Sequence, residues 1–222
     1  MMSQHFLVLL RKDTLLEWKA KDLLGFLFVF ALSVLLLFSF AWDMPSREWP
    51  NVAPGILWVT FLFAGVLSFQ RGFAVEKENH CLEALLISPL SPSSLFLAKA
   101  ASSLLWLTIL GLLVYPAFFI LHDLPFWNRL GKLFLIHVVG NAGFVSLGVL
   151  LSGVSSHARN KEALLPILMF PLSVPLFIGA IESTGSVLRG GPLGPWFGTL
   201  CSIAVILCVV SWLLCDWVWE EK

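Results

Sequence analysis

Charged residues are scarce in this sequence, and their scarcity indicates the class of protein. Of the 222 residues, 13% are charged and 58% are hydrophobic, and the mean hydropathy is +0.88. These values are too apolar for a soluble globular domain and are typical of an integral membrane protein. The 14 Lys and Arg residues balance 14 Asp and Glu residues, so net charge provides no argument for a nucleic-acid partner.

Sequence motifs of nucleotide and zinc sites are also missing. No GxxxxGKS or GxxxxGKT segment occurs, so the chain has no P-loop for ATP, and no HExxH or CxxC pattern indicates a zinc enzyme. If the chain takes part in active transport, another subunit must supply the nucleotide site. Of the 4 cysteines, Cys201, Cys208 and Cys215 recur at a heptad spacing in an apolar segment. This spacing favours buried thiols on one helix face over a redox or metal site.

Apolar runs long enough to cross a bilayer fill most of the chain. A span needs roughly 20 apolar residues in a helix, so the chain holds at most about six or seven spans and no large soluble domain. The candidate segments are Leu23–Trp42, Ala53–Phe69, Leu95–Leu121, Leu133–Gly153, Ala163–Ile181 and Trp196–Trp219. We therefore expect an all-α fold with six transmembrane helices and a single membrane domain over residues 1–222, because an open sheet edge has no hydrogen-bond partners in lipid. The sequence NVAPG, ahead of the second segment, is expected to break the helix.

Basic residues indicate the orientation in the membrane. If both ends of the chain lie on one side, only Arg47, Arg129, Lys132 and Arg189 of the 14 Lys and Arg residues fall on the other side. Basic residues concentrate in cytoplasmic loops, so both termini are predicted to be cytoplasmic.

Two cytoplasmic segments have amphipathic patterns. Residues 1–22 combine a stripe of apolar positions with charged positions at helical spacing, which predicts an interfacial helix on the cytoplasmic surface. The longest cytoplasmic connection, residues 70–94, contains three glutamates and three leucines that are candidates for docking a partner: Glu76, Glu78, Leu82, Glu83, Leu85 and Leu86. We favour a docking element over a solvated loop because the leucines would otherwise be exposed. For the second cytoplasmic connection, residues 156–163, the sequence does not distinguish an ordinary basic loop from a second docking point for a partner.

The polar residues inside the spans are few. His137 and Asn141 form an i, i+4 pair in the fourth segment, among glycines that allow neighbouring helices to approach closely. A polar contact between helices and a substrate or gating contact are both open for this pair. The 5 histidines lie on different segments, so no pair has the spacing of metal ligands on one helix. If any of them binds haem or a metal, His122 and His137 are the ones to test.

Three stretches of the sequence are distinctive: RKDTLLEWKAKD near the N-terminus, the unbroken run from Pro54 to Lys99, and the pair Gly140 and Asn141. Together they resemble the haem exporter B (CcmB) family of cytochrome c maturation. The most specific part contains WVTFLFAG and EKENHCLEALLISP, and the resemblance extends over nearly the whole chain. His80 and Cys81 depart from the small residues that are more usual in relatives, so neither is expected to have a role common to the family.

This resemblance implies a permease of the ABC exporter class in the bacterial inner membrane. It implies a homodimer that works with two copies of the ATPase subunit CcmA and associates with CcmC and CcmD. The complex would deliver haem to the periplasmic chaperone CcmE, either by moving haem as a substrate or by using ATP hydrolysis to release the loaded chaperone. ATP would be bound by the partner, and this chain would not itself be an enzyme.

The resemblance also assigns roles to the two amphipathic segments. It maps an elbow helix onto residues 1–22 and an ATPase-coupling helix onto Glu76 to Pro89. The coupling residues that it implies are Glu76, Glu78, Leu82, Glu83, Leu85, Leu86 and Pro89.

Two other classes of function compete with a permease. A passive membrane scaffold of a haem-handling complex would need docking surfaces without motion. A membrane enzyme acting on lipid or haem would need titratable groups that converge in a cavity, and the only clear candidates in the spans are His137 and, near one end, Glu182.

Overall fold

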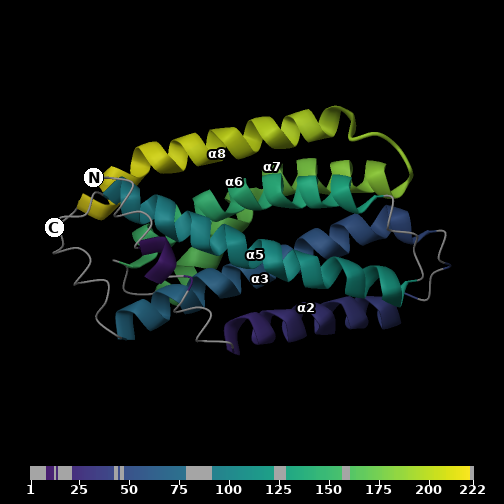
Figure 1. The fold of residues 1–222 in the computed structure, drawn as a ribbon, viewed down its shortest axis with the longest axis horizontal. Coiled ribbons are helices and arrows are strands. Elements are labelled where there is room, and N and C mark those ends of the chain that lie inside the picture. Colours follow the sequence, from purple (N-terminus) through teal and green to yellow (C-terminus); the bar gives the residue numbers. More distant parts are fainter. Residues whose placement is uncertain are drawn as a thin grey trace.

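In the computed structural model, the described part of the chain is a bundle of six long helices (Figure 1). The structure describes residues 9–12, 14, 22–42, 45, 48–78, 92–122, 129–156 and 161–220. The helices are α2 (Asp22–Ala41), α3 (Trp49–Glu78), α5 (Pro92–Leu121), α6 (Leu130–Ser156), α7 (Lys161–Leu188) and α8 (Gly194–Glu220). All six are long and apolar enough to cross a membrane. The predicted all-α fold with six membrane-spanning helices is therefore confirmed.

Successive helices run in opposite directions, so the bundle has two distinct ends. We call the end at which α2 begins and α8 ends the base, on the left in Figure 1, and the opposite end the top. At the base, the Ser93 hydroxyl near the start of α5 donates a hydrogen bond of 3.1 Å to the Asp216 carboxylate near the end of α8. At the top, Arg129 at the start of α6 donates a hydrogen bond to the carbonyl of Leu188, the last residue of α7.

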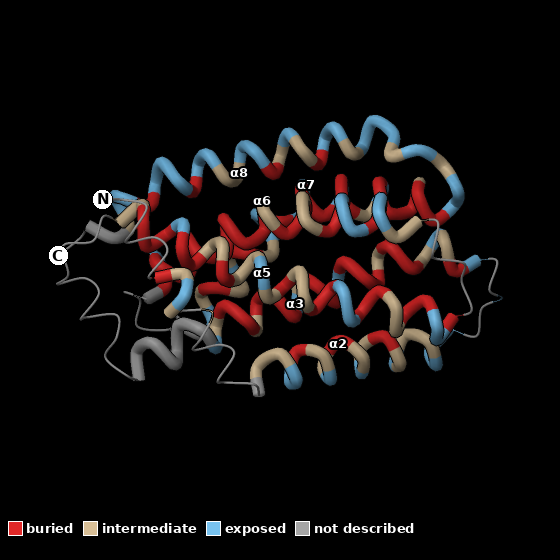
Figure 2. Tube along the Cα trace, in the orientation of Figure 1, coloured by how far each residue is buried: buried red, intermediate tan, exposed pale blue. Residues whose placement is uncertain are grey.

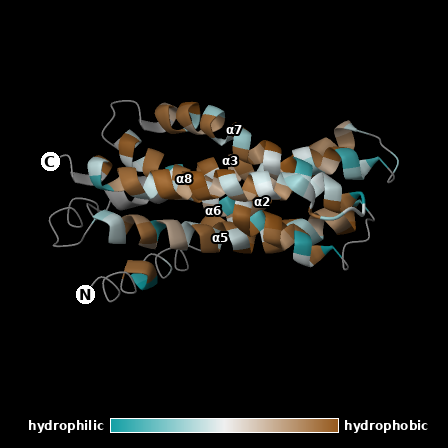
Figure 3. Cartoon of the chain, turned by 90° about the horizontal axis from the view of Figure 1, so that it is seen from above, coloured by the Kyte–Doolittle hydropathy of each residue, from teal (hydrophilic) through white to brown (hydrophobic). Residues whose placement is uncertain are grey.

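The core lies along α3 and α6, and α2 and α8 form the outer sides of the bundle (Figure 2). Large apolar side chains are also exposed on the outside, including Phe40 and Trp217 at 84% and 80% exposure. Hydrophobic residues therefore cover the helices along most of their length (Figure 3). An exterior that is apolar all round suits a lipid environment.

Glycines allow the central helices to pack closely. A Cβ atom built on Gly143 of α6 would lie only 2.9 Å from the Ala204 Cα atom of α8, so the two backbones touch at this point. The faces of Gly65 and Gly148 are covered by the rings of Phe144 and Phe69, which link α3 and α6 in both directions. Close approach through small residues is how helices gain contact area in lipid.

The ends of α3 differ from the sequence-based expectation. NVAPG does not break the helix, because α3 begins at Trp49 and continues through Pro54. That proline lies close to the start of the helix. Its missing N–H therefore removes one hydrogen bond near an end where the first backbone N–H groups have no partner within the helix in any case. At its other end α3 continues past Phe69 to Glu78, because residues 70–78 contain no proline to stop it.

Several predicted elements lie largely or wholly outside the described residues. Of the interfacial helix expected over residues 1–22, residues 9–12 and 14 are helical, and Leu9 is buried. Glu76 and Glu78 lie on the base end of α3, although their side chains are not described. The remaining coupling residues lie in the range 79–91, outside the described residues: Leu82, Glu83, Leu85, Leu86 and Pro89. His80 and Cys81 lie there as well.

Candidate functional site

A buried polar pair, His137 and Asn141 on α6, forms the centre of the candidate site. The two side chains are 0% and 1% exposed. His137 Nε2 lies 2.9 Å from Asn141 Nδ2 and 3.2 Å from the carbonyl oxygen of Leu107 on α5. The pair predicted from the i, i+4 spacing is thus formed, and it reaches the backbone of a neighbouring helix.

Gly111 on α5 provides the space for the histidine ring. A Cβ atom built on Gly111 would collide with His137 Nε2. Any other residue at this position would therefore push the ring away from the Leu107 carbonyl, one turn earlier on the same helix.

Alanine at Gly111 is expected to destabilise the protein. In a helix, Gly→Ala normally adds roughly 0.5–1 kcal/mol of stability, whereas forcing a methyl group into a packed core costs about 1–3 kcal/mol. Thermal unfolding in detergent should therefore show a lower melting temperature for Gly111→Ala than for wild type. Gly25→Ala is the matched control, because a Cβ atom at Gly25 meets nothing within 4 Å. Equal melting temperatures for the two variants would contradict this account of the His137 packing.

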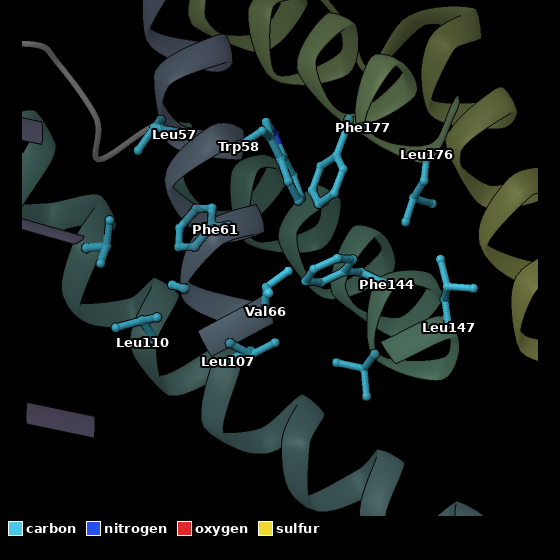
Figure 4. Close-up of a cluster of buried hydrophobic side chains, with 14 of the residues drawn as sticks. Leu57, Trp58, Phe61, Val66, Leu107, Leu110, Phe144, Leu147, Leu176 and Phe177 are labelled. Atoms are coloured by element: carbon cyan, nitrogen blue, oxygen red, sulfur yellow. The ribbon is translucent and has the colours of Figure 1, made fainter. Parts of the chain in front are cut away.

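Aromatic rings enclose His137 on the remaining sides. Its ring centroid lies 4.6 Å from that of Phe61, 5.3 Å from that of Tyr115 and 6.1 Å from that of Trp58. The Trp58 indole N–H donates a hydrogen bond of 3.0 Å to the Thr184 hydroxyl on α7. Figure 4 shows Trp58 with Phe61 beside it on α3 and with Phe177 of α7 across from it. The cluster therefore joins α3, α5, α6 and α7, and in this conformation it is a packed contact between helices.

Two polar atoms in this cluster have no hydrogen-bond partner among the described residues. They are the Tyr115 hydroxyl on α5 and the Nδ1 atom of His137 on α6, in side chains that are 3% and 0% exposed. Leaving a buried polar group unpaired costs about 1–3 kcal/mol. His137 Nε2 donates to the Leu107 carbonyl in one tautomer and accepts from Asn141 Nδ2 in the other, so Nδ1 is an acceptor in the first tautomer and a donor in the second. Because a phenol can donate or accept, Tyr115 and Nδ1 are complementary with either tautomer.

A second histidine, His122, lies directly after α5 at the top of the bundle. Its Nε2 atom is 3.1 Å from the Ser39 hydroxyl on α2, and its ring centroid is 3.7 Å from that of Trp49 on α3. The Phe118 ring centroid is 4.5 Å away. These contacts tie the top ends of α2, α3 and α5 together. Burial lowers the pKa of His122 below its ordinary value of 6.5, so the ring is neutral in this environment.

Acid is expected to weaken the His122 contact. The lowered pKa means that the unfolded chain binds the proton more tightly, so the stability from this residue is complete above about pH 6.5 and declines below it. Between about pH 7.5 and about pH 5, the melting temperature of wild type should fall further than that of His122→Gln, which does not titrate in this range. Parallel pH curves for the two proteins would show that protonation of His122 has no effect on stability.

The cysteines of α8 occupy one side of that helix, as predicted, but only one is fully buried. Cys215 is buried, whereas Cys201 and Cys208 are half-buried. The Cys208 sulfur lies 3.2 Å from the Ser146 hydroxyl of α6. This row therefore contributes to the packing of α8 on α6.

The chain has relatives among known proteins along nearly its whole length. The family described as CcmB protein matches residues 4–215. The chain belongs to the CcmB family. It is 27% identical to Heme exporter protein B of Pseudomonas aeruginosa over 209 residues, which are 93% of each chain. It is 32% identical to Heme exporter protein B of Paracoccus denitrificans, over 79% of this chain and 80% of the relative. Heme exporter protein B of Rhodobacter capsulatus is 30% identical, over 78% of this chain and 79% of the relative.

In this CcmB-family chain, the structure adds residues to the site that sequence reasoning did not find. Four residues that were not candidates pack around the His137 ring: Trp58, Phe61, Gly111 and Tyr115. One signal was available, because Tyr115 is the single tyrosine of the chain and lies inside an apolar span. A phenol in lipid needs a hydrogen-bond partner and therefore indicates a polar neighbour.

Proposed function

We propose that this chain is the membrane subunit of an ABC transporter that functions in haem export during cytochrome c maturation. The observation that carries the proposal is the match to relatives named Heme exporter protein B over 93% of the chain, together with six spans within the same range. Haem is then a transported or delivered substrate, and no cofactor of this chain is required.

A partner must provide the energy for such a transporter. The sequence contains no P-loop motif, so we assign ATP binding and hydrolysis to a partner ATPase, CcmA. CcmC and CcmD are the expected membrane partners, and CcmE is the expected acceptor of haem. The resemblance also implies that a second copy of this chain completes the transporter. The membrane is the bacterial inner membrane, with the base of the bundle on the cytoplasmic side.

The cytoplasmic link to the ATPase is the connection between α3 and α5. Both helix ends lie at the base, at Glu78 and Pro92 (Figure 1), which is the side where an ATPase would dock. In the coupling element, the leucines occupy a groove of the ATPase: Leu82, Leu85 and Leu86. Glu76, Glu78 and Glu83 pair with its basic residues, and Pro89 ends the helix. The elbow helix of residues 1–22 supports this face from the membrane surface.

The His137 cluster is the gating contact of the bundle. A gate needs two arrangements with different hydrogen bonds, because a ligand shifts an equilibrium only through differential contacts. In the arrangement described above, His137 bonds to Asn141 and faces the Leu107 carbonyl, while the Tyr115 hydroxyl and Nδ1 stay unpaired. In the second arrangement, α5 shifts against α6 and the Tyr115 hydroxyl pairs with Nδ1. The close packing around His137 supports a gating role over direct contact with haem, because rings cover the imidazole.

Complementation tests the proposed function. In a bacterium deleted for its own haem exporter B gene, expression of this chain should restore haem-stained c-type cytochromes. Membrane vesicles with the co-expressed CcmA should also hydrolyse ATP faster than vesicles that contain CcmA alone. Absence of c-type cytochromes despite normal membrane abundance would contradict haem export. Restored cytochromes with an unchanged ATPase rate would instead indicate a passive scaffold.

A further inference from the structure

Two arginines lie against the C-terminal end of α7, at the top of the bundle. Arg129, at the start of α6, donates a hydrogen bond from Nη1 to the carbonyl of Leu188. Its Nη2 atom lies 3.7 Å from a Cβ atom built on Gly190. Arg189 folds back along α7, so that its Nη1 atom lies 3.0 Å from a Cβ atom built on Gly185. The two glycines are separated by roughly 7.5 Å at the rise of an α-helix, so both guanidinium groups lie close to one helix end.

The turn that ends α7 accounts for only part of this arrangement. The N–H of Gly190 donates to the carbonyl of Val187, and the next N–H donates to the carbonyl of Ser186. This is the pattern of a Schellman turn, which pairs two of the last helical carbonyls but not that of Leu188. Arg129 Nη1 caps that carbonyl, and a cation suits the negative end of a helix. Capping explains neither the Nη2 atom nor the second arginine.

The turn beside Arg129 Nη2 presents little side-chain surface. Gly190 and Gly194 have φ angles of 87° and 68°, which favour glycine at both positions. Apart from chain neighbours, the only described atom within 4 Å of a Cβ built on Gly190 is Arg129 Nη2, and the only one near Gly194 is the Ser186 hydroxyl oxygen at 3.9 Å. Trp196 follows at the start of α8 and is 44% exposed. Two sets of N–H donors therefore adjoin an open turn and an exposed aromatic residue.

This arrangement suits a flat apolar ligand that carries two carboxylates. A guanidinium presents a rigid fork of N–H donors that matches a carboxylate, and hydrogen bonds between two charged groups are among the strong ones. Two forks at one helix end match two carboxylates on one molecule, and an exposed indole provides contact area for an apolar plane. Haem, the substrate in the proposed function, has this chemistry, because two propionate groups extend from one edge of its flat macrocycle.

We propose that Arg129 and Arg189 bind the two propionates of haem at the top of the bundle, with Trp196 against the macrocycle. The identity of the ligand rests on the proposed function. The site lies at the surface and is separate from the His137 contact, where aromatic rings cover the imidazole. In the proposed orientation of the chain it lies on the periplasmic side, where haem is delivered to its acceptor.

The phosphate of a lipid headgroup is the competing anion at this level of the membrane. Arginine and tryptophan both occur at membrane interfaces, and a phosphate also accepts hydrogen bonds from a guanidinium. A lipid at the arginines would leave the affinity for haem independent of both side chains. The two ligands are therefore separated by measuring haem binding directly.

Haem titration of the full chain in phosphatidylcholine nanodiscs tests the site. Binding is followed by the absorbance of haem, with empty nanodiscs subtracted. Arg129→Gln and Arg189→Gln should each raise the Kd at least about tenfold, because each removes hydrogen bonds to a charged group. Arg71→Gln is the matched control, because Arg71 is an exposed arginine near the base end of α3, and it should leave the Kd unchanged. A wild-type chain without saturable haem binding, or a wild-type Kd in Arg189→Gln, would overturn the proposal.

Arg189→Gln is the decisive variant, because Arg129→Gln also removes the cap of α7. The melting temperature of Arg129→Gln is therefore measured beside its Kd. Loss of haem binding in Arg129→Gln alone, together with a lower melting temperature, would indicate a structural role for the arginine and would overturn the proposal.

Haem dimethyl ester, in which both carboxylates are blocked, separates carboxylate recognition from apolar binding. It should bind the wild-type chain at least about tenfold more weakly than haem does, and Arg189→Gln should weaken its binding no further. Equal affinities of the wild type for haem and for the ester would overturn the proposal. So would an arginine effect that disappears in nanodiscs containing phosphatidylglycerol, because the arginines would then belong to lipid phosphate.

Cytochrome complementation is scored separately from haem binding. A chain that restores c-type cytochromes but binds haem independently of both arginines refutes only this site. Arginine-dependent haem binding by a chain that restores no cytochromes refutes only the proposed function.

Discussion

Leu85→Asp is expected to abolish stimulation of the partner ATPase while the chain remains inserted in the membrane. If the connection between α3 and α5 is helical, Leu82, Leu85 and Leu86 share one face. A carboxylate in the middle of an apolar contact remains unpaired when the two proteins dock, at a cost of about 3 kcal/mol or more, or a loss of at least about a hundredfold in affinity. ATPase rates of vesicles with equal amounts of this chain and CcmA measure the effect.

Ala84→Asp is the matched control for Leu85→Asp. It introduces the same charge one residue away, on the opposite face of the expected helix, and should leave stimulation nearly unchanged. Glu83→Ala should also lower stimulation, because it removes one of the proposed partners of the basic residues on CcmA. If Leu85→Asp and Ala84→Asp have equal effects, the apolar face is not the docking surface. Full stimulation in Leu85→Asp would move the ATPase contact to another part of the base.

The six spans were predictable because hydropathy is a sum over a whole segment. Replacing or shifting a few residues changes that sum little. The predicted span Leu23–Trp42 therefore agrees with α2, Asp22–Ala41, to within one residue at each end. The ends of helices depend on local chemistry that hydropathy does not record. At Phe69 the apolar run ends but the helix does not, so α3 was expected to be much shorter than its 30 residues. The expected helix break at Pro54 was wrong for a related reason. The free-energy cost of a proline in a helix depends on its distance from the helix start, which hydropathy does not record.

The candidate site was predictable only where its contacts are local. The His137 and Asn141 contact follows from the i, i+4 spacing on one helix. The contacts with the Leu107 carbonyl and the Tyr115 ring depend on how α5 lies against α6, which no spacing within either segment specifies. Gly111 illustrates the difference, because its role is visible only once the histidine ring is placed on it. Glu182 was noted as a charge at the end of a predicted span, but its exposure on α7 required the fold.

Tyr115→Phe is expected to uncouple ATP hydrolysis from haem delivery without destabilising the protein. The substitution removes one oxygen atom that has no partner in the described conformation, so the melting temperature should be unchanged or slightly higher. In the proposed second arrangement of α5 and α6, the same oxygen would bond to His137 Nδ1, and its loss would cost about 1–1.5 kcal/mol. The population of that arrangement should then fall by up to about tenfold, and with it the haem on CcmE per ATP hydrolysed.

Thr108→Val separates this effect from a general loss of hydroxyl groups on α5. The Thr108 hydroxyl donates a hydrogen bond of 2.6 Å to the Leu104 carbonyl of its own helix, so its removal touches neither Tyr115 nor His137. Haem delivery per ATP should therefore stay at the wild-type level in this variant. The gate would be refuted by a Tyr115→Phe protein that is as stable as wild type and equally coupled. A lower melting temperature in Tyr115→Phe would instead indicate that the hydroxyl has a structural partner in the resting state, because only a satisfied group stabilises the fold when it is buried.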